Sequence, residues 1–362
     1  MSKFYQEAEE FIKDIFWAET HDKDNNLNLE KVVADKLIED NKNKDPDYYN
    51  HRQGVVHVSS LAKCLRGVVY EMLGAQKTKP VEPRQLGVFR AGIFFEEFIV
   101  DSLGTKMLDR QTEYIYKYKN LILTGRDDGT IEHEGIRRIL EAKSVHSDSF
   151  WYREKEGTLV ASHNQMQLET YLYLRRILPN YFQVQPEGTE RKMELVYTNM
   201  SAEELIEYRG KGEQLGNIIT LEKPDNSNLN GFFSYVSKDD CTVIGVPVKF
   251  NQRIIDETVL PALDFIAEAF EKKDPNLVPT PALAVYSESR GQWQKNWLAT
   301  YCDYHDHCAG AGWLLEAQNL VTQKNKEQSA VSFAHTIKKV KPQIEVVGKV
   351  EPTPENNDAV KA

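Results

Sequence analysis

Two acidic residues and a lysine stand at a spacing that suits metal-assisted chemistry. The sequence reads Gly-Arg-Asp-Asp-Gly at residues 125–129 and Glu-Ala-Lys at residues 141–143. Asp128 precedes Glu141 by 13 residues, and two antiparallel strands joined by a turn bring positions so spaced side by side. Glu141 and Lys143 are two residues apart on one strand, so their side chains point to the same face. We therefore expect the three side chains to converge.

This trio matches the needs of phosphodiester hydrolysis assisted by a metal ion. Two carboxylates offer the hard oxygen ligands that Mg²⁺ or Mn²⁺ prefer, and a neighbouring lysine can orient the attacking water or stabilise developing charge. The alternative is structural, with Asp128 in a turn and Glu141 paired with Lys143 on an exposed strand. The Gly-x-x-Asp-Gly sequence upstream favours the catalytic interpretation.

Further polar residues are spaced so that they can join this site. Gln167 and Tyr171 are four residues apart in an expected helix, so they lie on one helical face. Glu96 and Glu97 end the sequence Gly-Ile-Phe-Phe-Glu-Glu, and their acidic side could approach the same metal ion. Each of these residues taken singly is better explained as surface decoration. Their order and spacing along the chain favour a shared site.

The order of these motifs resembles one known family. Gly-x-x-x-Glu, Gly-x-x-Asp, Glu-x-Lys and Gln-x-x-x-Tyr follow one another as in the PD-(D/E)xK nucleases of the RecB-like exonuclease branch, which includes the CRISPR-associated iron–sulfur exonucleases and their phage relatives. The resemblance runs over about residues 58–308. It implies an α/β, restriction-endonuclease-like core with a mixed central sheet flanked by helices, plus a C-terminal cysteine cluster lobe.

The resemblance also implies a role for each motif residue. Asp128 and Glu141 would bind the metal ion with help from the Ala142 carbonyl. The implied catalytic set is Asp128, Glu141, Lys143, Gln167 and Tyr171, with the last two positioning DNA or the lysine.

One position departs from the family pattern. The family often has a histidine, followed by Glu, three residues after the helix glycine, and this chain has Phe95 there. Either Glu96 supplies the ligand instead, or the ligand of the first helix is missing.

Cysteines at the two ends of this region resemble the family's iron–sulfur motif. Cys64 lies near its start, and Cys302 and Cys308 lie near its end. Ala299 stands where the family pattern has a further cysteine. Three thiolates therefore remain for four positions of a 4Fe–4S type cluster.

Two alternatives to a cluster remain open. A zinc site could add His305 or His307 to the three thiolates, because zinc accepts mixed cysteine and histidine ligands. Otherwise the site is degenerate and the cysteines are simply buried. Cys241 lies outside the pattern and is interpreted as an ordinary thiol.

Hydrophobic periodicity and turn signals predict the elements that position these residues. Gly74 is the expected end of the first helix, and Glu134-Gly135 is the expected turn between two strands. The order predicts an α/β core with a mixed sheet. Helices are predicted over residues 59–74, 88–103, 162–178 and 253–272, and strands over residues 112–117, 121–130, 136–144, 194–198 and 242–249.

Composition shifts divide the chain into three parts. Residues 1–54 are expected to form an N-terminal helical appendage and linker, and residues 55–310 the nuclease domain with the cluster cysteines at both ends. Residues 311–362 are expected to form a C-terminal helix and a disordered tail rich in Lys and Pro.

Overall composition restricts the function classes. The 362 residues are 41% hydrophobic, which supplies a packed core, and four cysteines are too few for a disulfide scaffold. No apolar run approaches the length of a membrane span, so a cytoplasmic protein without membrane contact is expected. The net charge of −10 argues against a passive DNA-coating protein, but bound divalent metal can supply positive charge to a DNA enzyme.

The predicted function is a metal-dependent DNA exonuclease that acts on single-stranded or free DNA ends with Mg²⁺ or Mn²⁺. Its setting would be phage or bacterial recombination, repair or CRISPR adaptation, with possible recombination or helicase partner proteins. Tyr171 or Tyr173 could stack on bases. The alternative is a catalytically weak or inactive DNA-end-binding subunit, which Phe95 and Ala299 favour.

Overall fold

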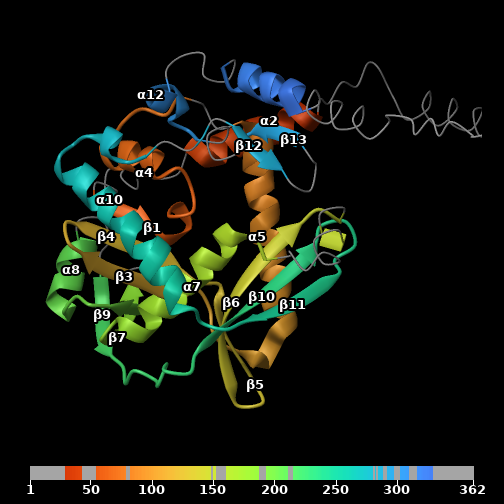
Figure 1. The fold of residues 1–362 in the computed structure, drawn as a ribbon. Coiled ribbons are helices and arrows are strands. Elements are labelled where there is room, and N and C mark those ends of the chain that lie inside the picture. Colours follow the sequence, from red (N-terminus) through yellow and green to blue (C-terminus); the bar gives the residue numbers. More distant parts are fainter. Residues whose placement is uncertain are drawn as a thin grey trace, which may run out of the picture. The chain divides into compact units, whose positions relative to one another are not determined.

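The computed structural model describes residues 29–42, 54–78, 82–147, 150–151, 160–186, 193–210, 215–279, 282, 284–287, 292–296, 302–309 and 316–328. The chain forms two compact units (Figure 1). The first comprises Met1–Pro281 and Trp297–Ala311, and the second Ala282–Asn296 and Gly312–Ala362.

A six-stranded sheet forms one half of the first unit. β1 is parallel to β4 and β3 is parallel to β8, while the other neighbours are antiparallel. The sheet is therefore mixed. Its strands, in spatial order, are β1 (Val55–His57), β4 (Leu121–Arg126), β3 (Glu113–Tyr118), β8 (Glu194–Thr198), β7 (Asn180–Pro186) and β9 (Leu215–Thr220).

A five-stranded sheet forms the other half and is also mixed. β6 is parallel to β10 and antiparallel to β5. The expected α/β class with helices flanking mixed β-structure is thus confirmed, but the strands form two mixed sheets instead of the single central sheet expected. The strands, in spatial order, are β11 (Val243–Val248), β10 (Asn230–Ser237), β6 (Ile136–Val145), β5 (Gly129–His133) and β2 (Met107–Asp109).

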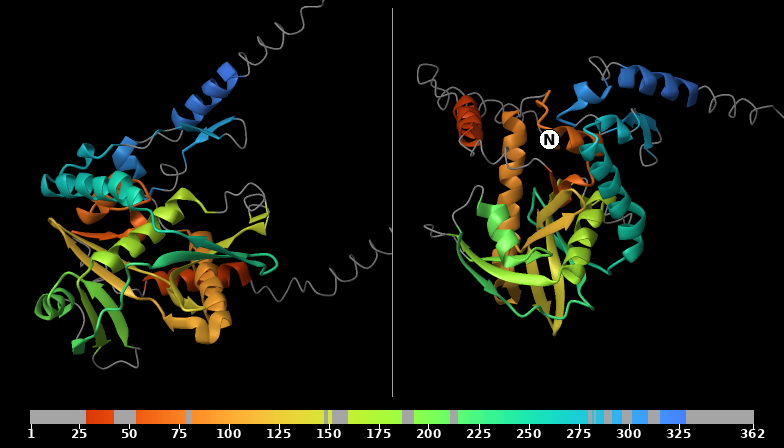
Figure 2. Two further views of the ribbon diagram at one scale, coloured as in Figure 1. Left: turned by 60° about the horizontal axis from the view of Figure 1, so that its bottom comes forward. Right: turned by 90° about the vertical axis from the view of Figure 1, so that its left-hand side faces the viewer.

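The helix α7 (Ser162–Ile177) joins the two sheets, because it contacts β3 in the first and β6 and β10 in the second. The helix α5 (Pro83–Leu103) lies on the other side of the second sheet (Figure 2). Ile139 and Leu140 on β6 show that the second sheet is covered on both faces, since both residues are fully buried but belong to different apolar clusters. Alternate residues of β6 therefore face α7 and α5.

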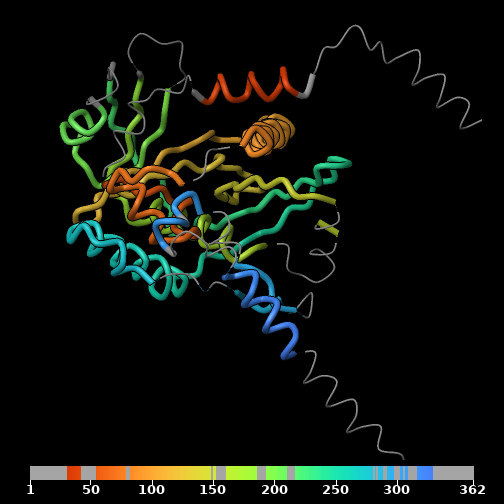
Figure 3. Tube along the Cα trace, turned by 90° about the horizontal axis from the view of Figure 1, so that it is seen from above, coloured from red at the N-terminus to blue at the C-terminus, as the bar shows by residue number. Residues whose placement is uncertain are grey.

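Shorter helices complete the first unit. In the described part of this unit they are α2 (Leu29–Lys42), α4 (Leu65–Met72), α8 (Ala202–Gly210), α9 (Gln252–Ile254), α10 (Leu260–Glu271) and α12 (His305–Ala309). The helix α10 packs on α4. The helix α2 lies against α5 (Figure 3). Arg90 Nη1 contacts Asp40 Oδ2 at 3.0 Å there.

The predicted strand over residues 121–130 is wrong in one informative way. It divides into β4 and β5, which belong to different sheets. The chain leaves the first sheet after Arg126 and enters the second at Gly129. Asp127 and Asp128 therefore occupy the crossing between the two sheets.

Other element boundaries also differ from the prediction. The expected helix over residues 59–74 becomes a 3₁₀ turn at Val58–Ser60 followed by α4, whose N-cap residue is Cys64. The helix ends before Gly74, where φ is +74°. The expected helix over residues 253–272 contains a π turn at Ile255–Val259 before α10 begins.

The sequence of the strand β10 does not show the alternation of apolar and polar residues that marks a half-buried strand. Five consecutive residues at its end are buried, because β10 is central in its sheet and covered on both faces. Such a strand shows no alternation of apolar and polar residues. Periodicity therefore did not indicate it.

The second unit contains a hairpin of β12 (Ala284–Ser287) and β13 (Gln292–Lys295) and a helix over residues 316–328. Asn325 on this helix accepts a hydrogen bond from the Trp293 main-chain N–H at 2.7 Å, and Lys324 Nζ lies 4.0 Å from the centre of the Trp293 ring. Residues 1–28 of the expected N-terminal appendage and the expected disordered tail after this helix lie outside the described residues.

None of the helices in the described part of the chain has the length and apolar composition that a bilayer crossing requires.

Candidate active site and cysteine group

The candidate active site begins at the crossing between the two sheets. Gly129 follows this crossing with φ of +147°, in a region that favours glycine. A Cβ atom there would lie 2.4 Å from Met107 Cε and 2.5 Å from the Asp109 main-chain oxygen. Only glycine lets the chain turn so closely against β2, and this turn sets the direction of Asp128.

Asp128 and Glu141 lie side by side, as their spacing predicted. The antiparallel register pairs Gly129 with Leu140. Asp128, the residue before Gly129, therefore lies opposite Glu141, the residue after Leu140. Asp128 Oδ2 accepts a hydrogen bond from the Ala142 main-chain N–H at 2.6 Å. This bond holds Asp128 on the edge of β6 although Asp128 itself belongs to no strand.

The Glu141 carboxylate is the centre of the site. One of its oxygens, Oε1, accepts hydrogen bonds from Lys143 Nζ and, at 2.8 Å, from Gln167 Nε2. The residue is 1% exposed. Its second oxygen, Oε2, is buried and has no hydrogen-bond partner among the described residues. A buried carboxylate oxygen without a partner is costly and is what a bound cation would satisfy.

Burial and mutual repulsion perturb the charges here. Burial, the Glu141 charge and the Glu96 charge together raise the pKa of Asp128 well above its usual range. Burial likewise raises the pKa of Glu141, against the attraction of Lys143. Burial opposes the charged form of Lys143, but the charges of Glu141 and Asp128 overcome it and raise its pKa. The site therefore places two carboxyl groups and one ammonium group close together in a buried environment.

Glu96 is the acidic residue of α5 that influences the site. It contributes to the raised pKa of both Asp128 and Glu141, and its Oε1 accepts a hydrogen bond from Gln111 Nε2 at 3.2 Å. Phe95 points elsewhere and packs in the apolar cluster between α5 and the second sheet.

Gln167 and Tyr171 lie beside Glu141 on one face of α7. The Tyr171 hydroxyl is 3.5 Å from Gln167 Nε2, and the Tyr171 ring stacks on Tyr114 with centroids 5.4 Å apart. Tyr171 is only 2% exposed, and Tyr173 is partly buried against the same core. The suggestion that Tyr171 stacks on bases is therefore wrong, because its ring faces are covered.

Three buried polar residues near this site were missed from the sequence. Asp127 lies in the crossing, and the buried side chains of Tyr114 and Arg175 contact its carboxylate. Burial raises the pKa of Asp127 to about 7, although Arg175 opposes this. The sequence feature that indicates Arg175 is its position four residues after Tyr171, which places both residues on one helical face.

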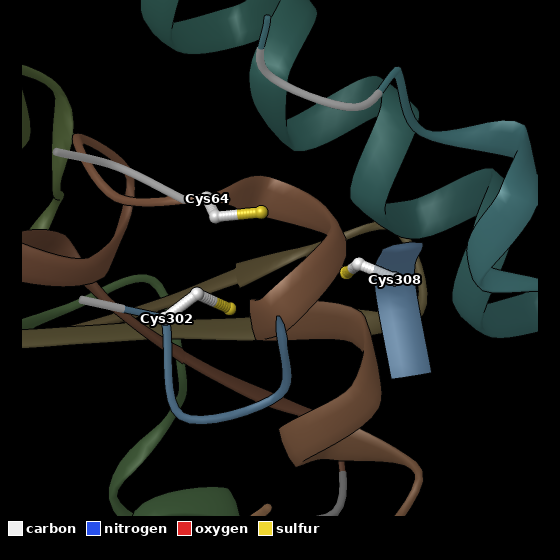
Figure 4. Close-up of side chains that lie close together, drawn as sticks. All are labelled: Cys64, Cys302 and Cys308. Atoms are coloured by element: carbon white, nitrogen blue, oxygen red, sulfur yellow. The ribbon is translucent and has the colours of Figure 1, made fainter. Parts of the chain in front are cut away.

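The cysteine group is confirmed as a cluster of three side chains. The Sγ atoms of Cys64, Cys302 and Cys308 all lie within 4.8 Å of one another. Figure 4 shows their side chains turned toward a common point from the start of α4, the segment before α12, and α12 itself. At Gly67 on α4, a Cβ atom would lie 2.8 Å from Cys302 Sγ, so the close approach needs glycine there.

The three cysteines shift one another's pKa values because their thiols lie within hydrogen-bonding reach. Hydrogen bonds with Cys302 and Cys308 lower the pKa of Cys64 to about 3, while those with Cys302 and Cys64 raise the pKa of Cys308. Three thiolates at this spacing need a metal centre to neutralise them.

The possible fourth ligands are only partly described. His307 Nε2 lies 2.9 Å from the Gln76 main-chain oxygen, and its ring packs on Tyr70 with centroids 5.2 Å apart. Ala299 and the His305 side chain lie outside the described residues. Cys241 is exposed and does not join the group.

Among the described residues, the cysteine group is the only set of three His, Cys, Asp or Glu side chains whose ligand atoms lie this close together. Asp128, Glu141 and Glu96 form a looser acidic set whose charges interact, and Lys143 Nζ contacts Glu141 Oε1. The first site thus offers two adjacent hard oxygen ligands, and the second three soft sulfur ligands.

No family model and no curated protein match the chain. A solved structure described as "Crystal structure of SSO0001" aligns with a TM-score of 0.38 and 15% sequence identity, covering 78% of this chain and 96% of that chain. At these values the likeness assigns neither a fold nor a function to this chain.

Proposed function

We propose that the chain is a metal-dependent DNA nuclease of the PD-(D/E)xK type that acts at single-stranded or free DNA ends. The observation that carries this proposal is the Glu141 carboxylate, which is buried beside Asp128 and has one oxygen without a hydrogen-bond partner in the described part of the chain. If Glu141 only formed a structural salt bridge with Lys143, its second oxygen, Oε2, would have no reason to be buried without a hydrogen-bond partner.

The residues present fit a hard divalent cation. Asp128 and Glu141 would hold Mg²⁺ or Mn²⁺, with the Ala142 carbonyl and Glu96 as further oxygen ligands. Burial and neighbouring negative charge raise the pKa of both carboxyl groups. A bound cation would relieve this repulsion and favour the ionised carboxylates.

The bound cation would lower the pKa of water and stabilise charge on the phosphate. Lys143, which is hydrogen-bonded to Glu141, would orient the attacking water and stabilise negative charge on the scissile phosphate. Gln167 would hold Glu141 in its orientation from α7, and Tyr171 would support Gln167.

The cysteine group fits a metal centre of a second, structural kind. Its sulfur ligands suit an iron–sulfur cluster with an incomplete cysteine set, or zinc with a fourth ligand from a histidine. Either group would tie α12 to α4, whose cysteines lie more than 200 residues apart in the sequence. We assign the group a structural role because phosphodiester hydrolysis needs no redox step.

End-labelled single- and double-stranded DNA incubated with Mg²⁺ or Mn²⁺ tests the function. Wild-type protein should shorten the DNA, and Glu141→Gln should abolish shortening while DNA binding persists. Glu132→Gln, on the exposed end of β5, is the matched control and should cleave normally.

Two results would contradict the proposal. Metal-dependent cleavage that survives Glu141→Gln would place catalysis elsewhere. DNA binding without cleavage by any variant would favour a non-catalytic DNA-end-binding subunit.

A further inference from the structure

A buried arginine extends the polar face of α7 beyond the candidate active site. Gln167, Tyr171 and Arg175 follow one another at intervals of four residues, so they share a helical face. The Arg175 side chain is only 4% exposed. Burying a guanidinium group costs free energy unless the group is paired. The partners of Arg175 must therefore offset the cost of its burial.

The partners of Arg175 come from three segments around the sheet crossing. Its Nη2 atom lies 3.0 Å from Asp109 Oδ2 on β2, and its Nη1 atom lies 3.6 Å from Asp127 Oδ2. Nη1 also donates a hydrogen bond to Thr130 Oγ1 on β5. One side chain of α7 thus binds β2, β5 and the crossing itself.

Asp127 transmits this anchoring to the metal site. It is fully buried, and its carboxylate accepts hydrogen bonds from the Tyr114 hydroxyl at 2.5 Å and from the Thr112 main-chain N–H at 3.2 Å. Its own N–H donates to the Thr112 main-chain oxygen at 3.1 Å. With both the main chain and the side chain of Asp127 held, the next residue, Asp128, has little freedom to turn away from Glu141.

We propose that Arg175 is a positioning residue for the metal site: through Asp127 and Thr130 it fixes the crossing that carries Asp128, and so sets the affinity for the divalent cation. The inference rests on the proposed function, because it takes Asp128 and Glu141 as metal ligands. It extends the functional face of α7 to Gln-x-x-x-Tyr-x-x-x-Arg. Because its side chain is buried among Asp109, Asp127 and Thr130, we assign Arg175 no direct contact with the metal or the DNA.

The test measures Mn²⁺ binding by calorimetry, without DNA and without turnover. Binding at this site is defined as the part that Glu141→Gln removes, which excludes ions held by the cysteines. Arg175→Met should weaken that binding by about 10- to 100-fold, as loss of groups that orient metal ligands does. The cleavage rate at saturating Mn²⁺ should change much less than the Mn²⁺ concentration required.

Arg209→Met is the matched control. Arg209 is also buried, with its side chain 7% exposed, and it bridges Glu113 and Glu194 in the first sheet. Its loss should lower the melting temperature about as much as Arg175→Met does, but leave Mn²⁺ affinity unchanged. A merely structural role for Arg175 predicts that the two variants behave alike.

Two further variants keep the test decisive if Arg175→Met does not fold. Arg175→Lys keeps the charge but cannot reach three partners at once, and Asp109→Asn weakens only one partner. Each should weaken Mn²⁺ binding several-fold. Unchanged Mn²⁺ affinity in every folded variant would overturn the inference.

The outcomes separate the inference from the proposed function. If wild-type protein binds Mn²⁺ through Glu141 but cleaves no DNA, the nuclease function fails and the role of Arg175 is still decided by the variants. If wild-type protein cleaves DNA and the Arg175 variants bind Mn²⁺ normally, the inference fails alone. Absence of Mn²⁺ binding through Glu141 in the wild type overturns both.

Discussion

The carboxylate of Asp128 accepts a hydrogen bond from the main-chain N–H of Ala142 at 2.6 Å. This single bond fastens the crossing between the two sheets to β6, at the residue between Glu141 and Lys143. It engages the Oδ2 atom of Asp128. The acidic pair is thereby assembled without a strand at Asp128.

The metal-free protein is expected to lose stability as pH rises. The folded-state pKa values of Asp128 and Glu141 are raised above the ordinary 3.8 and 4.5. Their contribution to stability is therefore fully present below those ordinary values and is lost as pH rises toward the raised values. Each unit of pKa shift corresponds to about 1.4 kcal/mol.

Asp128→Asn should remove much of this dependence, because the amide keeps an oxygen for the Ala142 N–H and carries no charge. We expect its free energy of unfolding at pH 8 to exceed that of wild type by about 1–2 kcal/mol in chelator-treated protein. Urea unfolding at pH 5 and pH 8 measures this. If Asp128→Asn is less stable than wild type at pH 8, the charge of the Asp128 carboxylate does not destabilise the folded protein.

Lys143→Met should lower the rate of DNA cleavage by about 100- to 1,000-fold, the usual cost of losing one group that stabilises transition-state charge. Metal affinity should not fall, because the variant removes a positive charge beside the ligands. Single-turnover cleavage at saturating Mn²⁺ measures the effect, with Lys249→Met as the control for an exposed lysine on the same unit. A loss that added Mn²⁺ restores would instead make Lys143 a determinant of metal binding.

Gln167→Ala should weaken Mn²⁺ binding by about 10- to 100-fold, because it removes the hydrogen bond that orients the Glu141 carboxylate. Titration calorimetry measures this change. Gln323→Ala, on the helix of the second unit, should leave binding unchanged. Normal Mn²⁺ affinity in Gln167→Ala combined with weaker DNA binding would assign Gln167 to the DNA instead.

Gly129→Ala should destabilise the fold by about 2–4 kcal/mol, since the new methyl group meets the Asp109 main chain at a φ that side chains rarely adopt. Gly135→Ala is the matched control. It also has positive φ, +73°, but its Cβ atom would meet no atom within 4 Å, so its cost should be only about 1 kcal/mol. Thermal unfolding distinguishes the two, and equal losses would contradict the close approach.

Cys64→Ser and Cys308→Ser should each release the bound metal of the cysteine group and lower the melting temperature, by about 2–4 °C for every kcal/mol lost. Elemental analysis and the visible absorption spectrum identify iron or zinc in the wild type. Cys241→Ser should retain the metal, because Cys241 is exposed and outside the group. Unchanged metal content in the Cys64 and Cys308 variants would assign the metal to another site.

Much of the candidate active site could be predicted from the sequence because its parts are local. Glu141 and Lys143 share a face through the two-residue repeat of a strand, and Gln167 and Tyr171 share one through the four-residue step of a helix. Asp128 meets Glu141 because a short turn joins β5 to β6. These relationships depend only on residues close together in the chain.

The tertiary structure alone decided how these parts are held. The break at Asp127 depends on Arg175 and Tyr114, which reach it from α7 and β3. The direction of Glu96 relative to Phe95 depends on which face of α5 packs on the second sheet. Burial of this kind follows from the packing of whole elements, which local periodicity does not encode.

The same division holds for the cysteines. Their residue types and the glycine at position 67 are written in the sequence, but the approach of Cys64 to Cys302 and Cys308 closes a loop of more than 200 residues. Closing such a loop costs entropy, and the packing of α4 with α10 and α12 offsets that cost. The sequence by itself determined which side chains could do chemistry, and the packing of distant elements decided which of them meet.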